Sequence, residues 1–382
     1  MTSALFSPLR LADLDLANRI VVSPMCRYSA NDGVASDWHM THLGMLANSG
    51  AGLLVVESTH VERNGRITHG CLGLYSDACE AALERVVAHC RRIGSAKLAI
   101  QLSHAGRKAS SQRPWEGGKA LPETEDPWPT IAPSAIPFGP GWHTPRAMTE
   151  DDMTRVRASF IDAAKRAVRI GFEAVELHLA HGYLLHEFLS PISNKRTDSY
   201  GGSLENRCRL LGEVVSAVRK VWPAAYPLFV RISATDWMEG GWDLDQSIQL
   251  VERIAPLGVD LIDCSSGGIA PGAKIPIRAG YQVPFAREIR NETDVMTGAV
   301  GLITSANQAD TILREESADV VIMAREFLRQ PYWPLQVAHD LGFPMPWPVQ
   351  YLRAAPDGTP TREPIRPPEG MDALAEHDAN LE

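Results

Sequence analysis

Eight short apolar runs, each followed by a segment with helical periodicity, constrain the fold of this chain of 382 residues more than any other feature. Most of the runs are continuously apolar, as strands are when helices cover both faces of a parallel sheet. The runs span residues 19–23, 53–57, 98–102, 174–178, 228–232, 259–264, 295–300 and 319–324. The helices that we predict span residues 38–49, 79–93, 151–170, 205–221, 244–255, 281–291, 305–315 and 332–341.

A succession of eight βα units predicts a closed (β/α)8 barrel, or TIM barrel, formed by one domain over residues 1–353. A doubly wound open sheet is the alternative, because the number of units alone does not exclude it. The glycine-rich fingerprint expected after the first strand of such a sheet is absent from the sequence. The longest break in the pattern, residues 103–148, is rich in Pro, Gly and Trp. In a barrel this loop lies on the face that carries catalytic groups.

Composition and charge exclude several classes of protein. The apolar runs are far shorter than the roughly 20 residues of a membrane helix, and the N-terminus lacks a secretory signal, so we expect a cytoplasmic protein without a membrane partner. The six cysteines form no C-x-x-C pair, which argues against a zinc ribbon, an iron–sulfur cluster and a disulfide framework. The net charge of −9 is not the footprint of a nucleic-acid-binding protein.

Part of the negative charge is concentrated at the C-terminus. Residues 354–382 carry seven acidic side chains against two basic ones, and they include few bulky apolar residues. Such a segment buries too little apolar surface to offset the entropy lost on ordering. We therefore predict that residues 354–382 form a disordered acidic tail.

Polar residues collect where the predicted strands end, which is where barrel enzymes place their reacting groups. The first strand leads into the segment SPMCRY at residues 23–28, and the third leads into QLSHAGRK at 101–108. The fourth leads into HLAHGY at 178–183, and the fifth carries Arg231. Gly301 follows the seventh strand, and Ala324 and Arg325 follow the eighth. These segments form the candidate active site.

The two histidines of the fourth segment have more than one chemical interpretation. His178 and His181 could bind zinc, as strand-end histidines do in barrel hydrolases, with Glu57 or Asp236 as a distant third ligand. A metal-dependent hydrolase is therefore one hypothesis. A purely structural role for the pair is another.

A longer motif favours a different chemistry. Residues 190–207 read SPISNKRTDSYGGSLENR, and over about residues 4–353 the chain resembles the old yellow enzyme family of FMN-dependent ene-reductases. Cys26 with Tyr28, the histidine pair, and the segment QYLR at 350–353 resemble the subclass called thermophilic-like. The resemblance implies non-covalently bound FMN at the carboxyl face of the barrel and NADPH as the reductant.

The resemblance also assigns residues to the cofactor. The Arg231 guanidinium, which is charged at any relevant pH, would lie at the N1/O2 edge of the flavin, and Gln101 offers a donor and an acceptor to the pyrimidine. Backbone N–H groups after the seventh and eighth strands would hold the phosphate. The residues predicted to bind FMN are Ser23, Pro24, Met25, Cys26, Ser58, Gln101, Arg231, Gly301, Leu302, Ala324 and Arg325.

For the reaction, the resemblance implies ping-pong transfer of hydride from NADPH to FMN, and from flavin N5 to the β-carbon of an α,β-unsaturated carbonyl or nitro compound. Tyr183 would protonate the α-carbon, since a phenol with a pKa of about 10 is an acid at neutral pH. His178 and His181 would donate hydrogen bonds to the substrate oxygen. Tyr28 and Lys108 would contact the substrate. The predicted catalytic residues are Tyr183, His178, His181 and Cys26, the last by tuning the flavin potential, and no metal is predicted.

Tyr351 and Arg353 follow the eighth helix, too far along the chain to belong obviously to their own pocket. In the subclass that the chain resembles, the matching arginine reaches a neighbouring active site, which implies a homodimer or a tetramer in which both residues contact substrate. A barrel that binds a phosphate-bearing ligand without catalysis is the remaining alternative. Relatives with an iron–sulfur cluster carry a cysteine cluster that this chain lacks.

Overall fold

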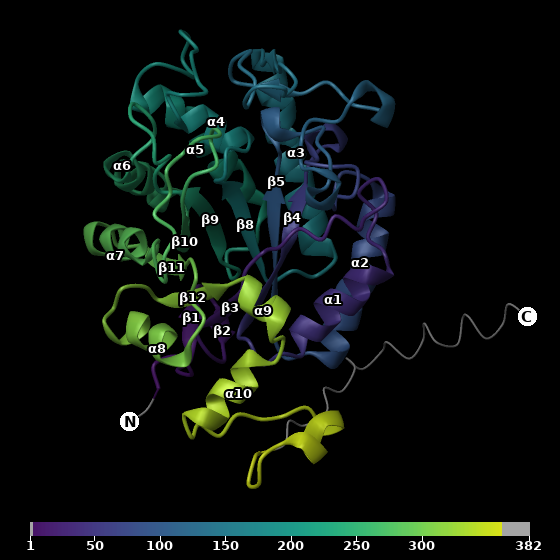
Figure 1. The fold of residues 1–382 in the computed structure, drawn as a ribbon, viewed down its shortest axis with the longest axis vertical. Coiled ribbons are helices and arrows are strands. Elements are labelled where there is room, and N and C mark those ends of the chain that lie inside the picture. The colour runs from purple at the N-terminus through teal and green to yellow at the C-terminus, as the bar shows by residue number, and fades with distance from the viewer. Residues whose placement is uncertain (1–2, 361–382) are drawn as a thin grey trace, which may run out of the picture.

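Eight parallel strands close into a barrel, and helices cover its outside (Figure 1). The computed structural model describes residues 3–360. Around the barrel the strands follow the order β10, β11, β12, β3, β4, β5, β8 and β9. Their bounds are β3 (Ile20–Val22), β4 (Leu53–His60), β5 (Lys97–Ser103), β8 (Ala174–Leu179), β9 (Leu228–Ser233), β10 (Leu261–Ser265), β11 (Met296–Val300) and β12 (Val320–Met323). The predicted (β/α)8 barrel is confirmed, and the open-sheet alternative is wrong.

The predicted helices form within two residues of their expected bounds. They are α1 (Asp37–Ala47), α2 (Asp77–Ile93), α3 (Glu150–Arg169), α5 (Leu204–Val221), α6 (Leu244–Ile254), α7 (Val283–Glu292), α8 (Ala306–Arg314) and α10 (Trp333–Asp340). Side-chain caps start several of them; the Ser76 hydroxyl, for example, accepts from Cys79 N at the start of α2. Two further helices, α4 (Leu184–Leu189) and α9 (Arg325–Arg329), are too short to give a periodic signal in the sequence.

Side chains alternate between the inside and the outside of the barrel along each strand. On β8, Val175 and Leu177 pack in the large core between the strands and the helices, whereas Ala174 belongs to the inner apolar cluster. Glu176 and Asp263 also face inward and line the interior. The barrel interior therefore combines an apolar layer with buried carboxyl groups.

A hairpin closes the amino end of the barrel. Its strands, β1 (Leu9–Leu11) and β2 (Leu14–Leu16), are antiparallel. Leu11, Leu14 and Leu16 are at most 4% exposed, and they pack with inward-facing side chains of the barrel strands. This plug confines any chemistry to the carboxyl end.

Shortening a side chain of the plug should destabilise the whole barrel. Leu16→Ala is expected to lower the free energy of unfolding by about 2–5 kcal/mol, because it leaves a cavity in the sealed interior. Urea unfolding followed by circular dichroism measures the change. Ile277→Ala is the control, since Ile277 is 70% exposed and its truncation should cost less than about 0.5 kcal/mol. Equal losses in the two variants would contradict the role of the hairpin.

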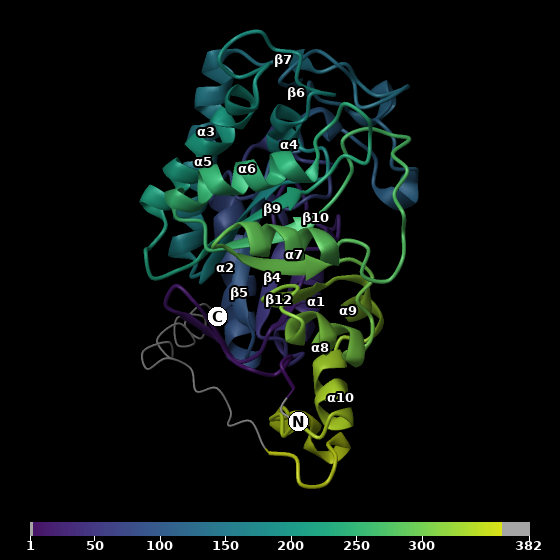
Figure 2. The ribbon, with the colours of Figure 1, turned by 90° about the vertical axis from the view of Figure 1, so that its left-hand side faces the viewer.

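The long loop after β5 lies on the same side of the barrel as the loop after β10 (Figure 2). It contains a short parallel pair, β6 (Ile131–Ala132) and β7 (Arg146–Ala147). Arg107 connects the two loops, because its guanidinium donates hydrogen bonds to the carbonyl oxygens of Ile136 and Ile269. The predicted loop after the third barrel strand is confirmed, and it contributes to the carboxyl face.

The chain beyond α10 lies at one end of the molecule in both views (Figures 1 and 2). A 3-10 helix, η6 (Val349–Ala354), is followed by a segment in which the Pro360 carbonyl oxygen accepts a hydrogen bond from Trp347 N at 3.1 Å. Residues 354–360 are the start of the predicted acidic tail, and residues 361–382 lie outside the described part of the chain. None of the helices within residues 3–360 combines the length and apolarity that crossing a bilayer requires.

Candidate active site

Side chains from separate strand ends meet at the carboxyl end of the barrel. Cys26 and Tyr28, after β3, and Tyr183, after β8, pack against one small apolar cluster. The cluster consists of Ile67, Cys71, Ala105 and Ala109. The Tyr183 ring meets the His178 ring edge-on, with centroids 5.0 Å apart. The fold therefore brings Cys26, Tyr28, His178 and Tyr183, all predicted site residues, to one place.

The two histidines form a neutral pair. His178 is buried on β8, and its Nδ1 accepts a hydrogen bond from Ala180 N at 3.1 Å, which leaves the ring proton on Nε2. His181 Nδ1 lies 3.3 Å from that Nε2 atom. Burial lowers the pKa of both rings well below the usual range, so neither is charged at neutral pH.

Ser265, at the end of β10, contacts the outer ring nitrogen of His181. Its hydroxyl oxygen lies 2.7 Å from His181 Nε2, whereas its other acceptor, Gln282 Oε1, is 3.5 Å away. A hydroxyl that donates to Nε2 leaves the proton of a neutral imidazole on Nδ1. In that tautomer the N–H groups at His178 Nε2 and His181 Nδ1 would both be available to one acceptor oxygen, as the sequence prediction requires.

A turn of unusual backbone conformation presents Tyr183. His181 and Gly182 are both left-handed, with φ angles of 60° and 72°. A Cβ atom at Gly182 would lie 2.1 Å from the carbonyl oxygen of Gly268, so only glycine fits. Gly182 N donates a hydrogen bond to His186 Nδ1 at 2.8 Å, which holds the turn from the side of α4.

Replacing Gly182 and Gly240 in turn should separate two costs in folding stability. One is the cost of the steric clash at Gly182, and the other is the cost of placing alanine in a left-handed conformation. Gly240 has a similar φ of 69°, but nothing lies within 4 Å of its virtual Cβ. Gly240→Ala is therefore expected to cost only the about 1–2 kcal/mol of a left-handed alanine. Gly182→Ala should cost clearly more, because the opposing atom is backbone. Urea unfolding of both variants tests this, and equal costs would contradict the proposed packing of the two loops.

Two carboxylates named as distant metal ligands serve the scaffold instead. Asp236 lies 3.0 Å from His186 Nε2 and accepts hydrogen bonds from Ser190 and from Trp242 N. Glu57 accepts a hydrogen bond from Arg27 N and thereby holds the loop after β3. Within residues 3–360, no group of three His, Cys, Asp or Glu side chains is arranged to hold a metal ion.

Four buried polar side chains form a layer inside the barrel, which we call the polar layer: Gln101, Glu176, Arg231 and Asp263. Gln101 Nε2 donates to Glu176 Oε1 at 2.7 Å, and Arg231 Nε lies 3.1 Å from Asp263 Oδ2. Burial, with a contribution from Asp263, raises the pKa of Glu176 to about 8, so Glu176 is protonated at neutral pH. Arg231 also donates a hydrogen bond to the Ser23 hydroxyl at 3.3 Å. The layer fixes the Gln101 amide and the Arg231 cation.

The residues predicted to hold a phosphate line one cavity of about 170 Å³. They are Gly301, Leu302, Ala324 and Arg325. Arg231 and Ser265 also line this cavity, so it connects the loops after β11 and β12 with the polar layer and with the partner of His181. The first N–H groups of α9 have no partner within the helix, and guanidinium and backbone N–H groups together favour an anion. The donor set therefore fits FMN: Arg325 and the backbone N–H groups would hold its phosphate, and Gln101 and Arg231 would contact its ring.

Other predicted cofactor residues lie beside this site. Pro24, Met25 and Cys26 are half-buried after β3. Burial raises the pKa of the Cys26 thiol well above its usual range, so the sulfur is protonated. The Ser58 hydroxyl on β4 is buried and has no hydrogen-bond partner among the described residues.

The remaining predicted substrate residues differ in position. Lys108 lies at the mouth of the barrel, with its Nζ 5.1 Å from the centroid of the Tyr183 ring. Tyr351 and Arg353 lie in η6 and are exposed, and the Tyr351 hydroxyl is 2.9 Å from that of Tyr332. The structure does not bring Tyr351 and Arg353 together with the other site residues of the same chain.

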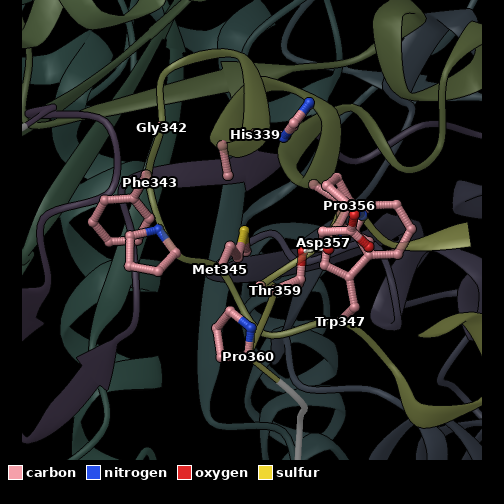
Figure 3. Close-up of a pocket in the computed structure, with 13 residues that line it drawn as sticks. His339, Gly342, Phe343, Met345, Trp347, Pro356, Asp357, Thr359 and Pro360 are labelled. Carbon is pink, nitrogen blue, oxygen red and sulfur yellow. Dashed lines mark hydrogen bonds between the residues drawn. The ribbon is translucent and has the colours of Figure 1, made fainter.

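A second cavity, of about 200 Å³, lies between α10 and residues 356–360 (Figure 3). Phe343, Met345 and Trp347 contribute to its walls. No strand end and no predicted site residue lines it. It is therefore not the candidate active site.

Comparison with known proteins supports the assignment of this site to a flavin-binding barrel. The chain matches the NADH:flavin oxidoreductase / NADH oxidase family over residues 4–342. It is 46% identical to NADPH dehydrogenase of Geobacillus thermodenitrificans over 355 aligned residues. The alignment covers 92% of this chain and 99% of that protein. Morphinone reductase has a similar structure, with a TM-score of 0.75 and 28% identity over 90% of this chain and 91% of that one. An old yellow enzyme homologue from Zymomonas mobilis gives a TM-score of 0.75 and 25% identity, over 88% and 93% of the two chains.

The barrel and its site define a flavin-dependent oxidoreductase. The chain belongs to the NADH:flavin oxidoreductase / NADH oxidase family, the family of old yellow enzyme, as the resemblance predicted. FMN is the cofactor of this family. The hydrolase hypothesis finds no support in these comparisons.

Several residues that build the site were absent from the sequence prediction. Glu176 and Asp263 carry the polar layer, Ser265 orients His181, and His186 holds the turn before Tyr183. The sequence did contain a signal for the two carboxylates. Each is a charged residue in an otherwise apolar strand, and such a residue in a barrel is expected to point into the interior. Ser265 and His186 gave no signal, since their roles depend on contacts between different loops.

Proposed function

We propose that the protein is an NADPH-dependent reductase of activated alkenes, which reduces the C=C bond of α,β-unsaturated carbonyl or nitro compounds. The reaction consumes NADPH, one proton and the alkene, and it yields NADP⁺ and the saturated product. When bound, FMN supplies the transfer of hydride from the nicotinamide to the alkene β-carbon. The names NADPH dehydrogenase and morphinone reductase, given to similar proteins, support NADPH as the reductant and a reducible small molecule as the second substrate.

In this proposal the histidine pair and Tyr183 act on opposite parts of the substrate. His178 and His181 donate hydrogen bonds to its oxygen and stabilise the negative charge that develops there. Tyr183 donates a proton to the α-carbon. Burial raises the pKa of its phenol well above the usual range, so the hydroxyl stays protonated until a strong base forms beside it.

One observation carries the proposal. The cavity lined by Gly301, Arg325 and Arg231 reaches Ser265, which contacts His181. The predicted phosphate site, the polar layer and the histidine pair are therefore continuous. A protein that only binds a phosphate-bearing ligand would have no need for the histidine pair.

Removing the Tyr183 hydroxyl should affect one half of the reaction. In Tyr183→Phe, reoxidation of the flavin by cyclohexenone is expected to slow by about 10- to 10⁴-fold, because the α-carbon loses its proton donor. Reduction by NADPH should stay close to that of the unmodified protein. Anaerobic stopped-flow absorbance near the flavin band measures the two halves separately.

Tyr226→Phe is the matched control for this experiment, because Tyr226 precedes β9 at the opposite end of the barrel. It should leave both halves unchanged. Equal slowing of reduction and reoxidation in Tyr183→Phe would contradict the assigned role. A protein that neither accepts electrons from NADPH nor passes them to an enone would contradict the proposed function itself.

We also propose that the protein is a dimer in which Arg353 reaches the site of the neighbouring chain. Of the nine large apolar side chains that are strongly exposed among the described residues, five lie between residues 328 and 351. They are Leu328, Leu341, Phe343, Val349 and Tyr351. An apolar surface of this kind next to an exposed arginine favours association of this end of the molecule with a second copy.

Mixing two inactive variants tests the shared site. A Tyr183→Phe chain still supplies Arg353, and an Arg353→Ala chain still supplies Tyr183. After subunit exchange, half of the sites in a mixed dimer contain both residues, so enone reductase activity should rise well above that of either variant alone. No gain on mixing, or a monomer in analytical ultracentrifugation, would contradict the shared site.

A further inference from the structure

Lys108 is held by two loops that come from different strands. It ends the 3-10 helix η2 (Gly106–Lys108), in the long loop after β5. Its Nζ donates hydrogen bonds to the carbonyl oxygen of His181 at 2.7 Å and to that of Gly268 at 3.1 Å. The first carbonyl belongs to the turn before Tyr183, and the second belongs to the loop after β10.

These two loops touch through their backbones. His181 and Gly182 on one side, and Gly267 and Gly268 on the other, all have left-handed φ angles between 60° and 93°. A Cβ atom at Gly268 would lie 2.7 Å from the His181 backbone. Both carbonyl groups are therefore presented by backbone that ordinary residues rarely adopt, and a cation between them offsets the repulsion of their oxygens.

Two aromatic rings also lie beside the Lys108 ammonium. Nζ lies 4.6 Å from the centroid of the Phe138 ring and 5.1 Å from that of the Tyr183 ring, which are cation–π distances. Two carbonyl oxygens and two aromatic rings, all from the protein, therefore surround the ammonium.

We propose that Lys108 is a positioning residue: it clasps the His181–Tyr183 turn to the loop after β10 and so keeps the phenol and the second imidazole in place for proton transfer. This inference rests on the proposed function of Tyr183. It differs from the role predicted from the sequence, in which Lys108 contacts the substrate.

The rest of η2 is anchored in the same region, which gives the clasp a rigid base. Arg107 N donates a hydrogen bond to Glu187 Oε1 at 2.8 Å, and Leu184 N donates to the carbonyl oxygen of His104 at 2.9 Å. These two hydrogen bonds connect the loop after β5 to α4, the helix that directly follows Tyr183. Lys108 therefore acts from a support that is already tied to the element it positions.

The charge of the Lys108 ammonium changes within a pH range in which the enzyme can be assayed. Burial, with a contribution from Arg107, lowers the pKa of the ammonium to about 8, and Glu187 opposes that shift. Above this pH the amine is neutral and its cation–π contacts are lost, so the proton transfer step should slow. His181 is already neutral and Tyr183 stays protonated there, because burial lowers the pKa of the first and raises that of the second.

Glu187 is the other buried group that titrates in this range, since burial raises its pKa to about 8 as well. Lys108→Arg separates the two groups, because arginine keeps its charge at high pH while Glu187 is untouched. Lys108→Met removes the charge and keeps the apolar length of the side chain. Lys274→Met is the control, because Lys274 is exposed in the loop after β10.

The experiment measures the two half-reactions of the FMN-loaded protein from pH 6 to pH 10, with NADPH and then cyclohexenone. We expect Lys108→Met to slow reoxidation by about 10- to 100-fold, as a small misplacement of a reacting group does, and to leave reduction by NADPH unchanged. The alkaline decline near pH 8 should be present in the unmodified protein and in Lys274→Met. It should be absent from Lys108→Arg, which retains part of the rate.

Hydrogen exchange supplies a readout that does not depend on activity. The amides of His181 and Gly182 donate to Ser233 Oγ and His186 Nδ1, so both are protected in the intact turn. Exchange at these amides should accelerate in Lys108→Met and not in Lys274→Met.

Three results would overturn the proposal: unchanged exchange in Lys108→Met, equal slowing of both half-reactions, or an alkaline decline that persists in Lys108→Arg. If the unmodified protein fails to use NADPH or the enone, the proposed function fails instead, and the exchange experiment still decides whether Lys108 clasps the turn.

Discussion

The ion pair between Arg231 and Asp263, 3.1 Å apart inside the barrel, is the constraint around which the site is built. A guanidinium in an apolar interior requires a counter-charge, because an isolated buried cation is costly. Asp263 supplies it from the neighbouring strand, where it stands directly opposite Arg231 in the register of β9 and β10. The Leu11, Leu14 and Leu16 plug seals the other end. The result is a fixed cation below an open mouth, which would stabilise a bound flavin that gains negative charge.

Above the polar layer, the loops after β8 and β10 contact each other and thereby fix the positions of the site residues they carry. Gly182 and Gly268 permit a backbone approach that any side chain would block, and the Ser265 hydroxyl contacts His181 Nε2 and so orients its ring. The motif at residues 190–207 serves the same end. Asn194 donates to the carbonyl oxygens of Phe188 and Tyr200 and so shapes the connection after α4. The most distinctive stretch of the sequence is therefore scaffold, and the reacting groups lie just before it.

Much of the architecture could be predicted from the sequence, because strand runs and helical periodicity report burial directly. The histidine pair, Tyr183, Gln101 and Arg231 could also be found, since each falls at a strand end and the barrel collects those ends. The hairpin β1–β2 could not, because its strands have three residues each and give no periodic signal. The clasp by Lys108 could not either, since the sequence shows its charge but not the two carbonyls that occupy it.

The site as described requires that the mouth of the barrel bind FMN through the Arg231 cation and the cavity lined by the loops after β11 and β12. This requirement can be measured by titrating the flavin-free protein with FMN and following the quenching of flavin fluorescence. We expect one FMN per chain and markedly weaker binding after Arg231→Met. A protein that binds no FMN, or binds it equally well without the guanidinium, would rule out this site.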